Sequence, residues 1–220
     1  MLELGGLYHT TWERRKLRII GLDEFEVLYD TLWEDGEWAI SADLNRNNAY
    51  ARSDYDHFLA SAEYVGHQPL TAKELVYFRP DLPIRIGRIR EFNWNSTPAG
   101  DKVAFEKAVA GLLKEDHGKK LDCPRIMLIP IGVNARAIRD PDGGISIVEL
   151  TRWGKMGRGV VKECAGEFDL LDLLWEAKCV QEQYADPAQR GIGLYRLGNH
   201  RSTPSYYIGG YIDLAEVMKG

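Results

Sequence analysis

The clearest pattern along the chain is a pair of runs rich in Ile, Val and Leu on either side of a polar turn signal. The runs are residues 125–133 and 145–150, and the sequence DPDGG lies between them at 140–144. Proline presets φ and glycine accepts a positive φ, so the chain is expected to reverse direction here as a β-hairpin. We expect this hairpin, residues 125–150, to form the centre of a sheet.

Helical periodicity marks three longer segments at 49–65, 101–116 and 168–184, where apolar residues recur every three or four positions. Strand-like runs are found at 38–41, 84–92 and 191–214. Strands and helices do not alternate strictly, which argues against a doubly wound parallel sheet. The order of elements therefore predicts an α+β fold, in which three main helices cover a mostly antiparallel sheet with the hairpin at its centre.

Shorter helices are expected before residue 80. One is expected over 11–20, followed by Gly21 as its terminator, and a second over 23–32, where apolar residues have a helical spacing. Thr71 and Glu74 have the S/T-x-x-E spacing of a capping box, which predicts a third short helix directly after Thr71.

Length and composition indicate one compact globular domain. A chain of 220 residues, 45% hydrophobic and 28% charged, is expected to bury enough surface to form a core without disulfide bonds or metal ions. Two prolines make residues 79–83 a possible subdomain boundary. Neither a membrane-spanning run nor the pattern of a signal peptide is present, so we expect a cytoplasmic protein without membrane contact. Three unclustered cysteines are expected to be buried thiols.

Charge is unevenly distributed along the chain. The numbers of Lys and Arg against Asp and Glu are 8 and 15 in residues 1–83, 15 and 10 in residues 84–163, and 5 and 8 in residues 164–220. A basic middle is able to contact phosphate or an acidic partner. The sequence pI near 5.6 argues against nucleic-acid binding as the main role, since a value above about 9 is typical of that class.

Two segments carry the basic candidates. Residues 84–92 alternate isoleucine and arginine around Gly87, which predicts an amphipathic strand with a bulge at the glycine. Residues 151–159 form a glycine-spaced basic loop that lacks the order of a dinucleotide or P-loop motif. The candidate contacts to nucleic acid or phosphate are Arg85, Arg88, Arg90, Arg152, Lys155 and Arg158. The alternative for the strand arginines is protection of a sheet edge against aggregation.

The stretch GLYHTTWERRKLRIIGL at 6–22, with the later fragments Ala39-Ile40-Ser41 and Ala49-Tyr50-Ala51, resembles the ADP-ribosyltransferase fold of the H-Y-E type. The resemblance covers residues 7–51. It implies an NAD-using enzyme in which His9 and Thr11 hold the ribose of NAD and Ser41 and Tyr50 line the cleft. The resemblance assigns His9, Thr11 and Tyr50 to catalysis and Ser41 to cofactor binding. The acid that such a site needs is then one of Glu149, Asp213 and Glu216.

For function, no metal-ligand spacing, phosphate loop or catalytic triad signature is found in the sequence. Six tryptophans and eleven tyrosines are numerous for a chain of this size, and such residues dominate interaction hot spots as well as cores. The leading hypothesis is a non-catalytic interaction module, an inhibitor or assembly component that binds a protein partner and needs no cofactor. The NAD-using enzyme is the alternative, and nucleic-acid binding through the basic middle is the third hypothesis.

Overall fold

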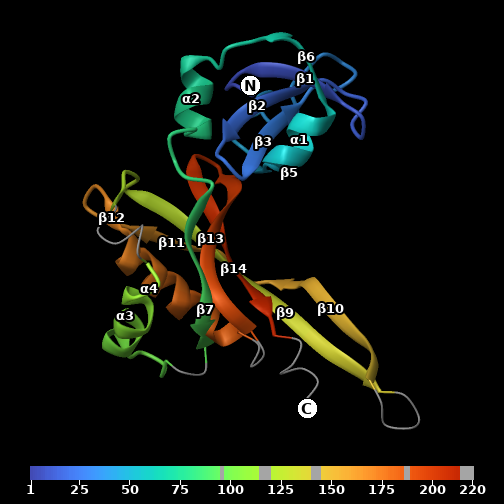
Figure 1. The fold of residues 1–220 in the computed structure, drawn as a ribbon. Coiled ribbons are helices and arrows are strands. Elements are labelled where there is room, and N and C mark those ends of the chain that lie inside the picture. The colour runs from blue at the N-terminus through green and yellow to red at the C-terminus, as the bar shows by residue number, and fades with distance from the viewer. Residues whose placement is uncertain (95–96, 114–119, 140–144, 186–188, 214–220) are drawn as a thin grey trace. The chain divides into compact units, whose positions relative to one another are not determined.

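The computed structural model describes residues 1–94, 97–113, 120–139, 145–185 and 189–213, with the backbone alone for 132–139, 145–156 and 212. Two compact units are present (Figure 1). Unit 1 contains Met1–Ile84 and Arg196–Ser205, and unit 2 contains Arg85–Tyr195 and Tyr206–Gly220. The expected single domain with a possible boundary at 79–83 stays a prediction.

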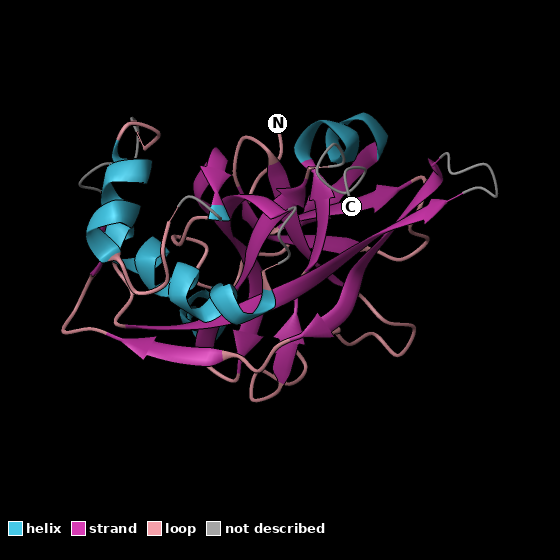
Figure 2. Ribbon diagram, turned by 90° about the horizontal axis from the view of Figure 1, so that it is seen from below, coloured by secondary structure: helices cyan, strands magenta, loops and turns pink. Residues whose placement is uncertain are grey.

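The fold is mixed α+β and mostly antiparallel sheet, as the sequence predicts (Figure 2). The described residues form four α-helices instead of the three main helices expected. None of these helices combines the length and apolar character that crossing a bilayer requires.

Unit 1 is built on a five-stranded antiparallel sheet with the order β5-β3-β2-β1-β6. Helix α2 begins after Thr71, where the expected capping box with Glu74 is present. The elements are β1 (Gly6–Thr10), β2 (Leu17–Leu22), β3 (Glu26–Thr31), β4 (Asn47–Ala49), β5 (Ala51–Asp54), α1 (Tyr55–Ser61), β6 (Ala62–His67) and α2 (Ala72–Phe78). Strand β4 pairs with β13, not with this sheet.

Strand β2 is buried on both faces and separates two hydrophobic clusters. Ile19 packs with Tyr8, Val27 and Phe58, whereas its neighbour Ile20 packs with the cluster that contains Tyr50 and Phe78. Successive residues of a strand point to opposite faces, so adjacent apolar residues are needed where both faces are covered.

That double burial explains why the helices expected over 11–20 and 23–32 are wrong. A strand covered on both faces has a continuous apolar run, whose periodicity does not distinguish it from a buried helix. The helix expected over 49–65 is reduced to α1, with β5 before it and β6 after it. The strand expected over 38–41 is a turn region, joined to Leu32 only by an isolated bridge at Trp38.

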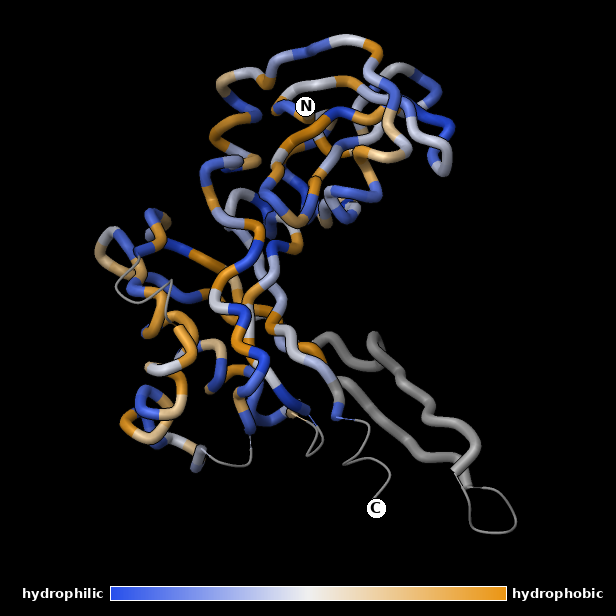
Figure 3. Tube along the Cα trace, viewed as in Figure 1, coloured by the Kyte–Doolittle hydropathy of each residue, from blue (hydrophilic) through white to orange (hydrophobic). Residues whose placement is uncertain are grey.

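Unit 2 contains most of a seven-stranded sheet with the order β10-β9-β14-β13-β4, in which β11 also pairs with β9 and β7 with β13. Hydrophobic and hydrophilic positions follow one another closely along β7 and β13 (Figure 3). The elements are β7 (Arg85–Asn93), α3 (Lys102–Ala110), β8 (Lys120–Leu121), β9 (Arg125–Arg139), β10 (Ile145–Met156), β11 (Val160–Glu163), β12 (Phe168–Asp169), α4 (Leu170–Gln181), the 3-10 helix η2 (Glu182–Tyr184), β13 (Gln189–His200) and β14 (Thr203–Ile212).

The expected hairpin does not lie at the centre of the sheet. Strands β9 and β10 pair antiparallel, from Ile145 opposite Arg139 to Met156 opposite Ile131, and the turn at 140–144 lies outside the described residues. Strand β10 is at one end of the strand order, and β14 and β13 are in its middle. Turn chemistry predicts the local pairing but carries no information on which strands flank the pair.

Helices α3 and α4 pack on one face of this sheet. The ring of Phe105 in α3 lies 5.5 Å from that of Phe92 in β7, and also 5.5 Å from that of Trp175 in α4. A Cβ placed on Gly87 of β7 would lie 2.5 Å from Cδ1 of Leu174, so α4 approaches the backbone of β7 closely. Phe92 and Gly87 of β7 therefore face these helices.

Candidate functional site

A pocket of about 560 Å³ is lined by residues of strands β7, β9, β13 and β14, all within unit 2. We call it the open-face pocket. Its lining contains two arginines, three tyrosines and, among others, two glycines that determine its shape: Arg88, Arg90, Tyr195, Tyr207, Tyr211, Gly191 and Gly209.

The two-residue period of a strand places the tyrosines on one side of the sheet. On β13, Ile192 and Leu194 are two positions apart and both buried, and Tyr195 directly follows Leu194. On β14, the buried Ile208 directly follows Tyr207. Side chains at alternating positions point to opposite faces. The tyrosines therefore point away from the face that carries the buried isoleucine and leucine side chains.

A β-bulge directs both arginines to this open face. From Ile86 to Ile89 strand β7 advances three residues, while its partner β13 advances two. The extra residue is Gly87 or its neighbour, and Gly87 has a φ of 58°, which glycine adopts without strain. Ile86 and Ile89 are thus both buried, and Arg88 and Arg90 are both exposed. The bulge expected from Gly87 is confirmed.

Glycines make room for the tyrosine rings. The rings of Tyr195 and Tyr207 are stacked, with centroids 5.0 Å apart and planes 14° from parallel. A Cβ on Gly209 would lie 2.6 Å from Cε2 of Tyr195, and one on Gly191 would lie 3.4 Å from Cδ1 of Tyr211. The indole Nε1 of the buried Trp94 donates to the carbonyl of Gly191 at 2.9 Å. The floor of the pocket is therefore held in place before any ligand arrives.

The pocket is positively charged at the β7 side. Arg88 and Arg90 are exposed, and neither forms an ion pair or hydrogen bond within the described part of the chain. No aspartate or glutamate is among the lining residues that the structure describes. A guanidinium offers five N–H donors in a fixed planar arrangement that matches carboxylate and phosphate oxygens.

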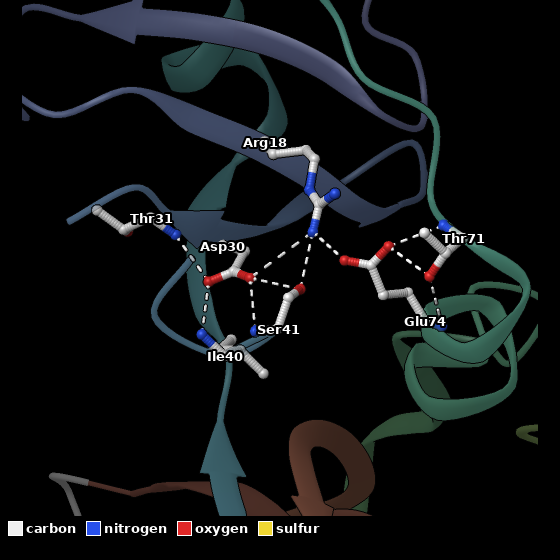
Figure 4. A network of polar contacts seen from close by, with 7 residues as sticks. All are labelled: Arg18, Asp30, Thr31, Ile40, Ser41, Thr71 and Glu74. Atoms are coloured by element: carbon white, nitrogen blue, oxygen red, sulfur yellow. Dashed lines mark hydrogen bonds and ion pairs between the residues drawn. The ribbon is translucent and has the colours of Figure 1, made fainter. Parts of the chain in front are cut away.

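A second polar cluster lies in unit 1 around a buried arginine (Figure 4). The Nη2 of Arg18 donates to Glu74 Oε1 and to Ser41 Oγ at 2.7 Å, and it lies 3.9 Å from Asp30 Oδ2. The guanidinium also lies over the ring of Trp38, 4.6 Å from its centroid. The cluster joins β2, β3 and α2, which carry Arg18, Asp30 and Glu74. Because only 1% of Arg18 is exposed, its guanidinium has little access to a ligand.

The two carboxylates of the cluster have opposite pKa shifts. Burial raises the pKa of Asp30, and its hydrogen bonds with Ile40 and Ser41 offset only part of that effect. Burial also acts to raise the pKa of Glu74, but hydrogen bonds with Thr71, Ser41 and Arg18 outweigh it and lower the pKa to about 2. Glu74 is therefore ionised at neutral pH and pairs with Arg18.

The residues expected from the ADP-ribosyltransferase resemblance lie in different surroundings. His9 is exposed on β1 opposite Glu63 of β6, and Thr11 is exposed just after β1. Tyr50 is buried in the core of unit 1, with the guanidinium of Arg196 5.5 Å from its ring centroid. Ser41 belongs to the Arg18 cluster.

The candidate acids and the other basic candidates are dispersed or undescribed. In unit 2, Asp213 Oδ2 lies 3.8 Å from Arg190 Nε. Arg85 is half-buried and pairs with Tyr195 across the sheet. Arg158 is exposed but does not line the pocket. Glu216 lies outside the described residues. The side chains of Glu149, Arg152 and Lys155 are likewise outside them.

Sequence reasoning found the two arginines of the pocket but missed its tyrosines. A usable signal was present, because Gly191, Gly193 and Tyr195 are spaced by two residues, as are Tyr207, Gly209 and Tyr211. Aromatic residues and glycines sharing the outer face of two neighbouring strands predict a hollow lined by rings.

No protein-family model, curated protein or solved structure matches this chain. Among the described residues, no three His, Cys, Asp or Glu side chains gather as a metal site. The ADP-ribosyltransferase resemblance therefore stays a prediction.

Proposed function

We propose that the protein is a binding module whose open-face pocket holds an anionic ligand. The observation that carries this proposal is the pair Arg88 and Arg90, which line a pocket of about 560 Å³ without a carboxylate partner in the described chain. Pockets of about 300–1,000 Å³ are typical of ligand sites. Hydrogen bonds between guanidinium and carboxylate or phosphate are charge-assisted and stronger than those between neutral groups.

The composition of the lining supports binding more than catalysis. The lining residues that the structure describes include no histidine, cysteine, aspartate or glutamate, which are the usual acids, bases and nucleophiles of enzymes. The proposal keeps the non-catalytic class that the sequence indicates. It selects an anion in place of a protein as the first candidate partner. A protein partner and an NAD-dependent activity have no comparable support from described contacts.

Attraction to an anion arises locally in unit 2. The sequence of unit 2 contains 18 Lys and Arg and 18 Asp and Glu, whereas unit 1 contains 10 and 15. Long-range steering of a polyanion is therefore weak, and most of the affinity has to come from direct contacts in the pocket.

Titration calorimetry with linear tripolyphosphate, an anion without a ring, tests the proposal. We expect saturable binding that weakens as salt rises, and at least tenfold weaker binding for the double variant Arg88→Ala/Arg90→Ala. The matched control is Arg125→Ala, which removes an exposed arginine of unit 2 that pairs with Glu163 outside the pocket. Absence of binding, or equal affinity of the wild type and the double variant, would show that the arginines do not form an anion site.

A further inference from the structure

We infer that the ligand of the open-face pocket is single-stranded nucleic acid, with unpaired bases stacked on the tyrosines and phosphates bound by Arg88 and Arg90. The inference rests on the proposed anion site and adds the chemistry of the uncharged part of the ligand. The pocket combines three tyrosine rings with two guanidinium groups that have no partner among the described residues. A nucleotide strand carries both complementary groups, a planar ring and an anion, in every repeat.

The strand order separates the two kinds of contact. Strand β13 lies between β14 and β7, so Tyr207 and Tyr211 are two strands away from Arg88 and Arg90. Neighbouring strands are about 4.8 Å apart, which places the tyrosine row and the arginine row about 10 Å apart. A ligand that satisfies both rows is an extended molecule with rings along one side and negative charges along the other.

Three rings favour a strand over a single nucleotide. Tyr195 and Tyr207 form one stacked pair, and Tyr211, which is 47% exposed, lies along β14 beyond Gly209. One base covers either the Tyr195–Tyr207 pair or Tyr211, and a second base of the same nucleotide strand is needed to cover both. Stacking of bases on aromatic side chains tolerates every base, because each base has a π face.

Unpaired bases are required because a duplex encloses the faces of its bases. The pocket has few groups able to read base edges, and Gln189 is the only side-chain amide among its described lining residues. We therefore expect binding that prefers single strands, depends weakly on sequence and responds mildly to salt. Two phosphate contacts on a single strand correspond to a slope of log K against log salt of about −1.4.

A purely structural account of the tyrosines is the competing explanation. Aromatic rings laid over strand glycines shield a weak part of a sheet, as Tyr195 does for Gly209. That account explains the tyrosine rings alone. It does not explain why Arg88 and Arg90 line a pocket and have no partner among the described residues. It also predicts no difference between ligands with and without bases.

Fluorescence anisotropy with four labelled probes separates these possibilities. The probes are a mixed-sequence DNA 16-mer, its duplex, an abasic 16-mer with the same number of phosphates, and a single nucleoside monophosphate. We expect the single strand to bind at least tenfold more tightly than each of the other three probes. The wild-type protein with all 220 residues is used.

Two variants link the preference for bases to the tyrosines. Tyr211→Ala is expected to weaken binding of the single strand about tenfold and to leave the abasic probe unchanged. Its control is Tyr64→Ala, which removes a similarly exposed tyrosine from β6 of unit 1. Gly209→Ala retains every arginine and tyrosine but displaces the Tyr195 ring, so it should have the same selective effect if thermal unfolding shows that it is folded.

Each other outcome overturns the inference. Equal affinity for the base-bearing and abasic strands shows that only the anion is recognised, and the anion site then stands or falls on the tripolyphosphate titration. A duplex bound as tightly as the single strand excludes stacking on unpaired bases. A monophosphate bound as tightly as the strand identifies a free nucleotide as the ligand. Failure of every strand to bind excludes nucleic acid, and tripolyphosphate again decides the proposed function.

Discussion

Arg18 shows how much a single buried residue determines in unit 1. Its guanidinium lies between the carboxylates of Asp30 and Glu74 and is stacked on Trp38. Removal of one partner from a buried ion pair leaves an uncompensated charge, which costs several kcal/mol. In the sequence Arg18 follows the exposed Arg14 and Arg15 closely, and the carboxylates that neutralise it come from the distant β3 and α2.

Glu74→Gln is expected to destabilise the protein at neutral pH and to flatten its response to acid. The folded-state pKa of about 2 lies below the ordinary value of 4.5, so Glu74 stabilises the fold above pH 4.5, and this contribution is lost as the pH falls toward 2. The shift corresponds to about 3 kcal/mol. Urea unfolding at pH 7 and at intervals down to pH 2.5 measures both effects. Glu106→Gln, which removes a more exposed acid, is the control, and an unchanged pH profile for Glu74→Gln would contradict the assignment.

Gly87→Ala is expected to cost about 2–5 kcal/mol of unfolding free energy. The new methyl group combines a backbone φ of 58° with a 2.5 Å approach to Leu174 Cδ1. A left-handed backbone costs about 1–2 kcal/mol and overpacking about 1–3 kcal/mol. Gly100→Ala separates the two effects, because Gly100 has a φ of 74° with nothing within 4 Å of its Cβ position. Equal costs in urea unfolding for the two variants would show that contact with Leu174 contributes nothing.

Local chemistry decides which single residues the sequence predicts. The capping box of Thr71 and Glu74 depends on residues three apart and was predicted correctly. The bulge at Gly87 is also predicted from local sequence, because a glycine interrupts the alternating pattern of the strand. The second role of Glu74, its contact with Arg18 across 56 positions, depends on tertiary packing that no local pattern contains.

At the scale of elements, helices with one covered face are predictable and strands covered on both faces are not. Helices α3 and α4 lie within the expected segments 101–116 and 168–184, and β7 matches 84–92 closely. Strands β2 and β3 have apolar runs that resemble those of helices. Their pairing partners, which determine the strand conformation, become visible only in the folded unit.

Gln181→Met is expected to loosen the attachment of α4 to β9 and to cost about 2–6 kcal/mol. The Gln181 amide donates to the Ile131 carbonyl at 2.7 Å and accepts from the Ile131 N–H at 3.0 Å, and all of these atoms are buried. Methionine has a similar shape but leaves both backbone groups without partners, at about 1–3 kcal/mol each. Thermal and urea unfolding measure the loss against the exposed control Gln183→Met. A loss no larger than that of the control would mean that water replaces the amide.

At the scale of the whole molecule, each unit is assembled from two separate segments of the chain. The carbonyl groups of Tyr77 and Phe78, at the carboxyl end of α2, accept hydrogen bonds from the side chains of Asn199 and Arg196. These are carbonyls that a helix cannot satisfy internally. The guanidinium of Arg52 also donates to the backbone carbonyl of Arg196. Arg196 and Asn199 of the second segment are thus buried within unit 1.

A fragment of residues 1–84 is therefore expected to be less stable than the same fragment joined by a short Gly/Ser linker to residues 196–205. The shorter fragment lacks the buried Arg196 and Asn199 and leaves the end of α2 without its partners. Circular dichroism during urea unfolding provides the comparison. The control is a linked segment that carries Arg196→Ala and Asn199→Ala. Equal stability of the fragment with and without the linked segment would show that unit 1 is independent of residues 196–205.

Strands β13 and β14 each run without interruption from one unit into the other. Occupation of a ligand site on Tyr195, Tyr207 and Tyr211 suppresses fraying of the strands that carry them, and the same backbone continues to the ladder between β13 and β4. Amide hydrogen–deuterium exchange at residues 47–49 and 198–200 is therefore expected to slow when the site is filled, although none of these residues lines the pocket. A single hairpin would then make thermodynamic cooperativity between the units an inherent property of the chain.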